Sequence, residues 1–520
     1  MHLPSRSAQT MSKVIATFLT LAILGGCAPQ SDEAPPAEKI IVYPASGDTN
    51  VNIDTPLTLT FSDTPIVGKT GFIRVYDVKT GALVDKIDLS IPASPLPSGR
   101  FPPNTNQAKI FALGRNSQMS DYQVNHIGGE DFHFHPIIVH ENTATLYLHN
   151  NKLEYGRTYQ ITLSNGTLSA EGTSFEGISK DDGWTFTTKP NAPASDTHRV
   201  IVAADGSEDF STVQGALDFA PSAPERPFEI FVKNGNYEEL VFVKDKSNFT
   251  IRGESRDGVV VSYPNNSAFN PPRGGPSRRP AFSIYNVSDV QLSNFTIKNN
   301  FIGQAEALLV RGDKVVLDHM TLDGSGDALT TAGSIYMADS SLRGDGDTIL
   351  AYATLYCLRC EISSAGPFVW PRTPEGQHGN IFVDSKFVYL DEPLPWTISE
   401  ESPEGQKTNG VLARLPRNGP SSTNANFPHA EMVLINSQTQ GIPEIGWGPV
   451  EDPSTLDWRG VFFAEYNTQD TSGRTIDMAK RHPIVRYLQL PEDKALIEKY
   501  SNPEFVLGWK PEIRAPQTSK

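Results

Sequence analysis

Three short stretches with the same pattern decide the fold: "VVLDHMTL" (315–322), "IYMADSSL" (335–342) and "LYCLRCEI" (355–362). In each stretch the third residue is apolar, and a second apolar residue follows five positions later. Taking Leu292, Leu317, Met337, Cys357 and Val383 as equivalent positions gives steps of 25, 20, 20 and 26 residues. Because the strands are short and no helices separate them, this period predicts a solenoid of stacked coils, and specifically a parallel β-helix.

The same register places two aspartates at equivalent positions on successive coils. Asp327 in "DGSGDALTT" lies ten residues after Leu317. Asp347 in "RGDGDTILA" lies ten residues after Met337. Because neighbouring strands are about 4.8 Å apart, we expect the two carboxylates to approach within about 5–8 Å. Their pKa values would then separate, leaving one as a base or nucleophile and the other as an acid. The alternative is a solvent-exposed row of aspartates that accept hydrogen bonds from turn amides.

Length and composition set the wider frame. A chain of 520 residues predicts two or three domains, and its 41 glycines and 40 prolines favour many turns and β structure. The net charge of −16 argues against a nucleic-acid partner, whose phosphates require a basic surface. It also disfavours a densely anionic substrate unless the binding groove is locally neutral or basic.

The N-terminus has the features of an export signal. An apolar run of eleven residues (14–24) follows basic residues and ends in "LGGC" at Cys27. This ending resembles the lipobox of bacterial lipoproteins. We therefore expect a signal peptide over 1–26, lipidation of Cys27, a Pro-rich tether over 27–39, and an outer-membrane lipoprotein on its periplasmic or cell-surface side. A buried N-terminal helix is the alternative.

Two folded parts are expected after the tether. Residues 40–190 contain short stretches of alternating apolar and polar residues, such as "GFIRVYD", which predict a β-sandwich. "LEYGRTYQITL" and the closing "WTFTT" resemble bacterial Ig-like domains. A linker over 191–198 leads to the β-helix, over 199–512. Its open end is expected to be capped by a helix near 211–220, with Asp209 or Ser211 as the N-cap.

The N-terminal part also contains a group of histidines within "HIGGEDFHFHPIIVHENT": His126, His133, His135 and His140. Two of them would lie on one face of a strand, as a metal site requires. No cysteine and no clear spacing completes a ligand set. The favoured interpretation is therefore histidines on a strand face or between domains, with no metal.

Several motifs follow one another in the β-helical part: "GNYEELVFVKDKSNFTIRGES", "QAEALLV", "GDAL", "GDTILAYATLYCLRCEI", "VLARLP", "IGW", "FFAEYNTQDTSGRT" and "FVLGW". In this order they resemble the pectin methylesterase family of carbohydrate esterases. The second to fifth motifs align with the family's "QAVAL", "QDTL", "DFIFG" and "LGRPW". The resemblance covers about residues 199–510 and implies an all-β chain with a right-handed parallel β-helix.

The resemblance implies a role for four residues. Asp347 would be the nucleophile that attacks the methyl ester of galacturonate, and Asp327 would be the acid and then the base. Arg414 would pair with Asp347 and keep it ionised. Gln304 would donate a hydrogen bond to the oxyanion. No metal or organic cofactor is implied.

Two substitutions depart from the family pattern. A second oxyanion glutamine is replaced by Gly326, and removal of one such donor typically lowers the rate by about 10²- to 10³-fold. The tryptophan of "LGRPW" is replaced by Pro416, which removes a stacking platform for a sugar ring. Trp447, Phe368 and Trp370 are candidates to bind substrate in its place, or equally to pack in the core.

A long loop, "NPPRGGPSRRPAF" (270–282), contains three arginines in an otherwise acidic protein: Arg273, Arg278 and Arg279. They could meet substrate carboxylates, but a solvated loop is the favoured interpretation.

The leading hypothesis is a monomeric envelope esterase that removes methyl groups from pectin or oligogalacturonides, with a lipid anchor in the membrane and no nucleic-acid partner. Its net acidity favours heavily esterified stretches of the polymer. One alternative is a carbohydrate-binding lipoprotein that has lost turnover through Gly326. Another is an esterase or thioesterase for a non-pectic acyl substrate.

Overall fold

The computed structural model describes residues 40–101, 112, 116–170, 175–416, 427–448 and 459–517. The predicted signal peptide, Cys27 and the tether lie outside the described residues, so these expectations stay predictions. Within the described ranges, no helix combines the length and the apolar character that crossing a membrane requires.

Two sheets make up the N-terminal part. Their strands are β1 (Ile41–Tyr43), β2 (Asp48–Val51), β3 (Leu57–Thr60), β5 (Phe72–Asp77), β6 (Leu83–Asp88), β9 (Ile137–His140), β10 (Thr143–Leu146), β11 (Thr158–Leu163) and β13 (Thr185–Thr188). One sheet has the order β1-β3-β10-β9 and the other β2-β13-β11-β5-β6. Leu59, Val75 and Ile161 join one buried apolar cluster that both sheets share, so the two sheets pack as a sandwich. The resemblance to Ig-like domains stays a prediction.

Two short antiparallel pairs accompany these sheets. One pairs β4 (Pro65–Val67) with β12 (Leu168–Ala170), and the other pairs β7 (Val124–Ile127) with β8 (Glu130–His133). The last sandwich strand ends at Thr188 and the next strand of the chain begins at Arg199. The exact division into 40–190, 191–198 and 199–512 stays a prediction.

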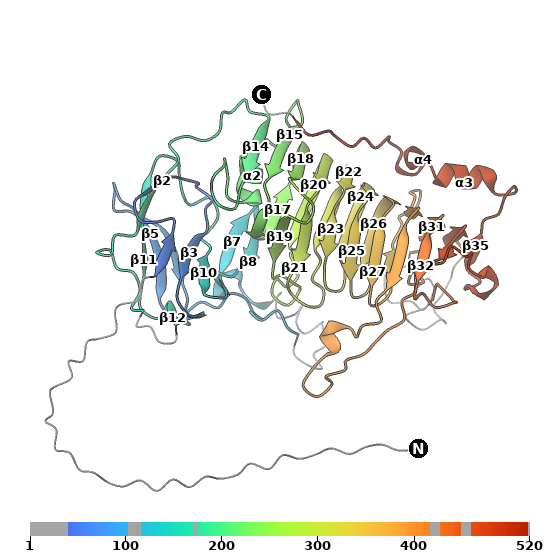
Figure 1. The fold of residues 1–520 in the computed structure, drawn as a ribbon, viewed down its shortest axis with the longest axis horizontal. Coiled ribbons are helices and arrows are strands. Elements are labelled where there is room, and N and C mark those ends of the chain that lie inside the picture. The colour runs from blue at the N-terminus through green and yellow to red at the C-terminus, as the bar shows by residue number, and fades with distance from the viewer. Residues whose placement is uncertain are drawn as a thin grey trace, which may run out of the picture. The chain divides into compact units, whose positions relative to one another are not determined.

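A parallel sheet of thirteen strands begins at Arg199. Its strands are β14 (Arg199–Val202), β15 (Phe228–Val232), β17 (Val241–Lys244), β18 (Ser247–Gly253), β20 (Phe282–Ser293), β22 (Leu308–Asp318), β24 (Leu329–Ala338), β26 (Ile349–Leu358), β28 (Val369–Pro371), β29 (Asn380–Val383), β31 (Glu431–Ile435), β33 (Phe462–Tyr466) and β35 (Val485–Tyr487). Figure 1 shows these strands side by side, from green at β14 to red at β35.

A second parallel sheet has nine strands. They are β16 (Gly235–Glu238), β19 (Val259–Tyr263), β21 (Thr296–Asn299), β23 (Thr321–Asp323), β25 (Ser341–Gly344), β27 (Glu361–Ser364), β30 (Lys386–Tyr389), β32 (Gln438–Gln440) and β34 (Gln469–Asp470). The chain alternates between the two sheets, for example β22, β23, β24, β25, β26 and β27 in sequence. The parallel β-helix predicted from the repeat is confirmed.

The longest strands turn a corner of the coil. The first part of β20 pairs with β17 and its second part with β18, so one strand belongs to two faces. Asn286 and Asp289, with φ of 52° and 54°, lie at this corner. Asparagine and aspartate tolerate the left-handed region better than most residues, which suits them to the corner.

The register of the repeat is confirmed for four of its five positions. Leu292, Leu317, Met337 and Cys357 are direct neighbours on successive strands. The fifth position was wrong, because Cys357 pairs with Phe382 and not with Val383. Phe382 joins the core inside the coil, whereas the side chain of Val383 belongs to a separate cluster on the other face. A shift of one residue along a strand changes the face, and the true step is therefore 25 residues.

Among the described residues, three α-helices pack on the β-helix. The predicted helix is α2 (Val213–Phe219), which places Val213 and Leu217 in the core of the coil. Its N-cap is Thr212, whose side chain accepts a hydrogen bond from the Gly215 N–H, and not Asp209 or Ser211 as expected. Near the C-terminus, α3 (Lys494–Tyr500) and α4 (Pro503–Leu507) pack on the outer face of the large sheet.

Candidate active site

Three carboxylates occupy equivalent positions on successive coils. Strands β22, β24 and β26 pair so that the residues two positions after Glu306, Asp327 and Asp347 are direct neighbours. The predicted stacking of Asp327 and Asp347 is confirmed in this register. Glu306 was missed, although the repeated pattern "EALL", "DALT" and "DTIL" contains it. The site is therefore a line of three acids and not a pair.

Asp347 is held by one arginine. Arg414 donates from Nη1 to Asp347 Oδ2 at 2.6 Å, while Asp347 Oδ1 is buried and has no hydrogen-bond partner among the described residues. Burial raises the pKa of Asp347, and the Arg414 guanidinium opposes this rise. The Asp347 backbone has φ of 49°, a region that side chains other than Asn and Asp rarely adopt. One carboxylate oxygen is thus bound by Arg414, and the other is buried without a hydrogen-bond partner among the described residues.

Asp327 lies in a different environment. Its Oδ2 accepts from Arg279 Nη2 at 3.1 Å, and its side chain is 14% exposed. Burial raises the pKa of Asp327 well above its ordinary range; Glu306 and Asp347 add to the rise, whereas Arg279 and Arg372 oppose it. Of the two carboxyl groups, Asp327 has the more strongly raised pKa, which favours its protonated form.

Together the two aspartates divide the work that ester hydrolysis needs. Asp347, beside Arg414, has an unpaired oxygen that can attack a carbonyl carbon. Asp327, with its strongly raised pKa, can give a proton to a departing alkoxide. Because each carboxylate titrates in the presence of the other, the apparent pKa values belong to the pair.

Gln304 lies on the coil before Asp327. Its Oε1 accepts a hydrogen bond of 2.6 Å from the hydroxyl of Ser267. The amide oxygen is thereby occupied, and the NH₂ group remains to donate. Its backbone φ of 46° is strained for a glutamine, and backbone strain of this kind is concentrated at functional sites. This geometry fits the role of oxyanion donor that the resemblance implies.

Replacing Gly326 with glutamine would strain the folded protein. Its φ is 81°, and a Cβ atom built there would lie 3.2 Å from the backbone nitrogen of Gln304. Both features disfavour a side chain at this position. The backbone at this position therefore favours glycine over the glutamine of the family pattern.

We expect Gly326→Gln to destabilise the protein by about 1–3 kcal/mol without raising its activity, because of the strained φ and the close contact. Urea unfolding measures the free energy of unfolding. Gly376→Gln is the matched control, since Gly376 has φ of 76° and nothing within 4 Å of its added Cβ. It should be destabilised less. A Gly326→Gln protein as stable as the control would show that the site accepts a side chain there.

Arg372, which has no ionic partner among the described residues, lies beside the pair. The Arg372 guanidinium lies 3.6 Å from the centre of the Trp370 ring and 4.5 Å from that of Tyr352, and Arg414 lies 4.0 Å from the same Trp370 ring. Arg372 Nε is buried and has no hydrogen-bond partner within the described ranges. Burial lowers its pKa to about 10, so it stays charged near neutral pH. No spacing in the sequence identified Arg372.

The three aromatic residues expected to bind substrate divide into two kinds. Trp370 is partly exposed and packs against Arg414, within reach of the site. Phe368 and Trp447 are fully buried in the core, and the Trp447 indole donates to Glu465 at 2.6 Å. A fully buried ring cannot stack on a sugar, so the packing alternative describes these two residues.

An exposed tryptophan near the site was not foreseen. Trp396, in the short 3-10 turn Pro395–Thr397, is 45% exposed. Its side chain lies next to Gly303, where an added Cβ would contact it at 3.8 Å. Trp396 therefore lies beside the residue that precedes Gln304, and its exposed indole can stack on a sugar ring.

The arginine loop is not solvated as expected. Arg273 donates to the carbonyl and the hydroxyl of Ser117, and Arg278 donates to Glu130 at 3.0 Å. Arg279 contacts both Glu306 and Asp327. Each guanidinium is therefore bound by other parts of the protein and not by solvent alone. Arg279 belongs to the candidate active site, because it contacts Asp327.

The four histidines of the N-terminal part have separate partners. His126 pairs with Asp131 and His140 with Glu238, while His135 stacks on Phe269 at 4.3 Å. Burial lowers the pKa values of His133 and His135 to about 4, so both are neutral near pH 7. These contacts match the interpretation of strand-face or interdomain histidines.

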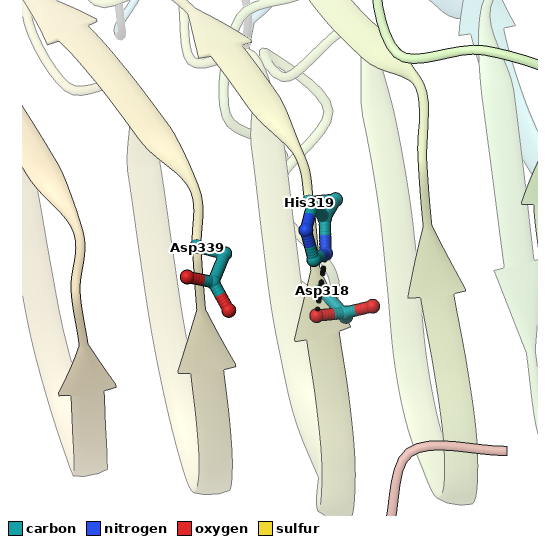
Figure 2. A group of neighbouring side chains, drawn as sticks. All are labelled: Asp318, His319 and Asp339. Carbon is teal, nitrogen blue, oxygen red and sulfur yellow. Dashed lines mark hydrogen bonds and ion pairs between the residues drawn. The ribbon is translucent and has the colours of Figure 1, made fainter.

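One other group of side chains has the composition of a metal site. Asp318, His319 and Asp339 place ligand atoms within 4.8 Å of one another, as Figure 2 shows. Asp318 already accepts from His319 Nδ1 at 2.9 Å, and both oxygens of Asp339 bond Arg359 at 2.7 and 2.6 Å. The charges of this group are therefore balanced by protein partners.

Part of the chain is similar to known proteins. Residues 199–376 match the family model described as Pectinesterase. The segment 199–376 is a pectinesterase-family domain. A curated pectinesterase from Ralstonia nicotianae is 26% identical over 341 residues, covering 56% of this chain and 82% of that protein.

Two solved structures are also similar to the chain. The pectin methylesterase PemA from Erwinia chrysanthemi is 20% identical with a TM-score of 0.47, and covers 61% of this chain and 99% of its own. A pectin methylesterase in complex with a hexasaccharide gives the same identity, TM-score and coverage. The pectinesterase domain contains Gln304, Asp327 and Asp347, whereas Arg414 lies beyond the matched segment.

Proposed function

We propose that this chain is a carboxylic ester hydrolase that removes methyl groups from methyl-esterified galacturonan. One observation carries the proposal: Asp327 and Asp347 stack on neighbouring coils of a pectinesterase-family domain, and only Asp347 is paired with Arg414. The pair is thereby divided into a nucleophile and an acid.

The first half of the reaction forms an acyl-enzyme. Asp347 Oδ1, which has no hydrogen-bond partner among the described residues, attacks the ester carbonyl carbon. Negative charge develops on the carbonyl oxygen, where the NH₂ group of Gln304 can donate to it. Collapse of this intermediate breaks the bond to methoxide, and Asp327 protonates the departing oxygen to give methanol.

The second half returns the enzyme to its starting state. Asp327, now ionised, accepts a proton from water as the water oxygen attacks the galacturonyl carbonyl carbon. The bond to Asp347 breaks, Asp347 returns as a carboxylate, and Asp327 again holds its proton. The galacturonic acid leaves and releases its remaining proton to solvent. Arg414 stabilises the Asp347 carboxylate that is released in this step.

The charges near the pair suit a polymer that contains both esters and free carboxylates. Net acidity of the whole chain favours the heavily esterified stretches. Locally, however, Arg372 has no ionic partner in the part of the chain that the structure describes, and it lies among aromatic rings. An arginine beside exposed rings can bind a sugar acid by charge and stacking together. Trp396 offers a further surface for a ring in place of the tryptophan that Pro416 replaces.

Gln304→Leu should lower kcat for methanol release by about 10²- to 10³-fold with little change in KM, because the donor acts on charge that develops only in the transition state. Steady-state assays on methylated pectin measure both constants. Ser267→Ala tests the orientation of the amide and should give a smaller loss, since it removes only the partner of Gln304 Oε1. A Gln304→Leu variant with unchanged kcat would show that Gln304 is not the donor.

A carbohydrate-binding protein without turnover is the second candidate, and Gly326 is the observation that favours it. A protein that binds the polymer needs the arginines and aromatic rings near the site but not a second oxyanion donor. An esterase or thioesterase for another acyl group differs from both in its substrate.

One assay separates these functions. Purified full-length chain is incubated with highly methylated pectin, and released methanol is measured against the same pectin after chemical de-esterification. The proposed function requires methanol from the first substrate only. Binding of oligogalacturonides with no methanol from either supports the binding protein. Hydrolysis of small acyl esters, with neither methanol nor binding, supports the third possibility.

We further propose that the protein acts as a monomer at the outer membrane. The proposed place at the membrane rests on the lipobox-like "LGGC" that ends in Cys27 and on the Pro-rich residues that follow it. Radiolabelled palmitate should be incorporated into wild-type chain and not into Cys27→Ser.

A further inference from the structure

A buried ion pair stands beside the candidate acid, and the proposed reaction uses neither of its members. Arg279 Nε donates to Glu306 Oε1, and Arg279 Nη2 contacts Asp327 Oδ2 at 3.1 Å. One guanidinium thus lies between two carboxylates. The side chain of Glu306 is fully buried, and that of Arg279 is 20% exposed.

Four hydrogen bonds from neighbouring residues fix the position of this ion pair. Asn299 Nδ2 donates to the carbonyl oxygen of Glu306 at 2.9 Å and to that of Arg279 at 3.4 Å. The Ala281 N–H also donates to the Glu306 carbonyl at 3.0 Å, and the hydroxyl of Thr330 donates to Glu306 Oε1 at 3.3 Å. The contact with Asp327 is therefore a fixed part of the coil.

We infer that Glu306 and Arg279 are positioning residues that orient Asp327 while allowing it to keep its proton. The inference rests on the proposed function, because the acid of that reaction must begin each cycle protonated. An arginine alone beside Asp327 would favour the ionised carboxylate. Glu306 neutralises Arg279 and offsets this effect. Asp327 thus gains a fixed hydrogen-bond partner without losing its proton.

The other charges around Asp327 fit this balance. Burial raises the pKa of Asp327, and Glu306 and Asp347 raise it further, whereas Arg279 and Arg372 lower it. These groups come from the coil before Asp327, the arginine loop, the coil after it and the segment that follows β28. Loss of Glu306 leaves the lowering effects of the two arginines less opposed.

Two single variants should therefore shift the titration of Asp327 in opposite directions. Glu306→Gln should lower the pH at which Asp327 loses its proton by about 1–2 units, and Arg279→Gln should raise it by a similar amount. The double variant, in which both charges are gone, should lie between them. Infrared difference spectra measure this titration through the carboxylic acid C=O band that is absent from Asp327→Asn. In parallel, the alkaline limb of kcat/KM for methanol release should move in the same directions.

Glu229→Gln is the matched control, since Glu229 is another buried glutamate of the same β-helix, paired with Arg199 at 2.9 Å and Arg252 at 3.4 Å. It should not move the infrared titration of Asp327. Shifts of Glu306→Gln and Arg279→Gln in the same direction, or no shift in either, would overturn the inference. If Glu306→Gln does not fold, the infrared titrations of Arg279→Gln and of the double variant test the inference instead. Opposite infrared shifts without methanol release would support the positioning role and reject the proposed function.

Discussion

Asp347→Asn should reduce methanol release from methylated pectin by on the order of 10⁴-fold or more, because it removes the nucleophile and leaves the rest of the site in place. The amide has almost the shape of the carboxylate, and the side chain is 21% exposed, so the fold should remain. Asparagine cannot form the acyl-enzyme, and the ion pair between Arg414 and Asp347 is lost. A coupled assay for methanol on purified variants measures the loss.

Asp339→Asn is the control for this experiment. Asp339 resembles Asp347 in its φ of 49°, in a side chain that is 27% exposed and in a bond of 2.6 Å to an arginine, Arg359. It differs in its place on the coil: Asp339 directly follows β24, whereas each of the three acids lies just before a strand of the large sheet. Asp339→Asn should therefore keep its activity. If Asp347→Asn retains a rate within about tenfold of the wild type, the nucleophile is another group.

The twenty-residue repeat made the line of acids partly predictable. Once Leu317, Met337 and Cys357 are aligned, Asp327 and Asp347 fall on neighbouring coils. Glu306 does not follow the same count. Asp327 and Asp347 lie ten residues before Met337 and Cys357, whereas Glu306 lies eleven residues before Leu317. The difference arises because the pairing of β22 with β24 shifts by one residue between Gly312 and Val315. A period identifies equivalent positions well where the coils have equal length.

Other features of the site have no such signal in the sequence. Arg279 reaches Asp327 from a loop between strands, and the contact depends on the path of that loop and not on a period. Likewise, the sequence could not tell a buried ring from an exposed one at Phe368, Trp370 and Trp447. Those residues lie near turns and insertions, where the alternation of faces along a strand ends. The choice between packing and binding needed the structure.

Asp327→Asn should lower methanol release by about 10²- to 10⁴-fold, because the methoxide would leave without a proton and the later water would lack a base. The size of this loss should depend on the leaving group, unlike the loss in Asp347→Asn. A nitrophenyl ester of the same sugar acid releases a stable anion that needs no proton. Its acylation step should therefore survive in Asp327→Asn.

The second half of the reaction makes this difference visible. In Asp327→Asn the acyl-enzyme forms but cannot be hydrolysed quickly, so stopped-flow absorbance should show a burst of about one nitrophenolate per enzyme followed by slow turnover. Asp347→Asn should show no burst. Because the pKa of Asp327 is raised, the wild-type rate on the methyl ester should fall as pH rises through that pKa, and the burst in Asp327→Asn should not. A variant that lost both esters equally would place Asp327 in binding or structure and not in proton transfer.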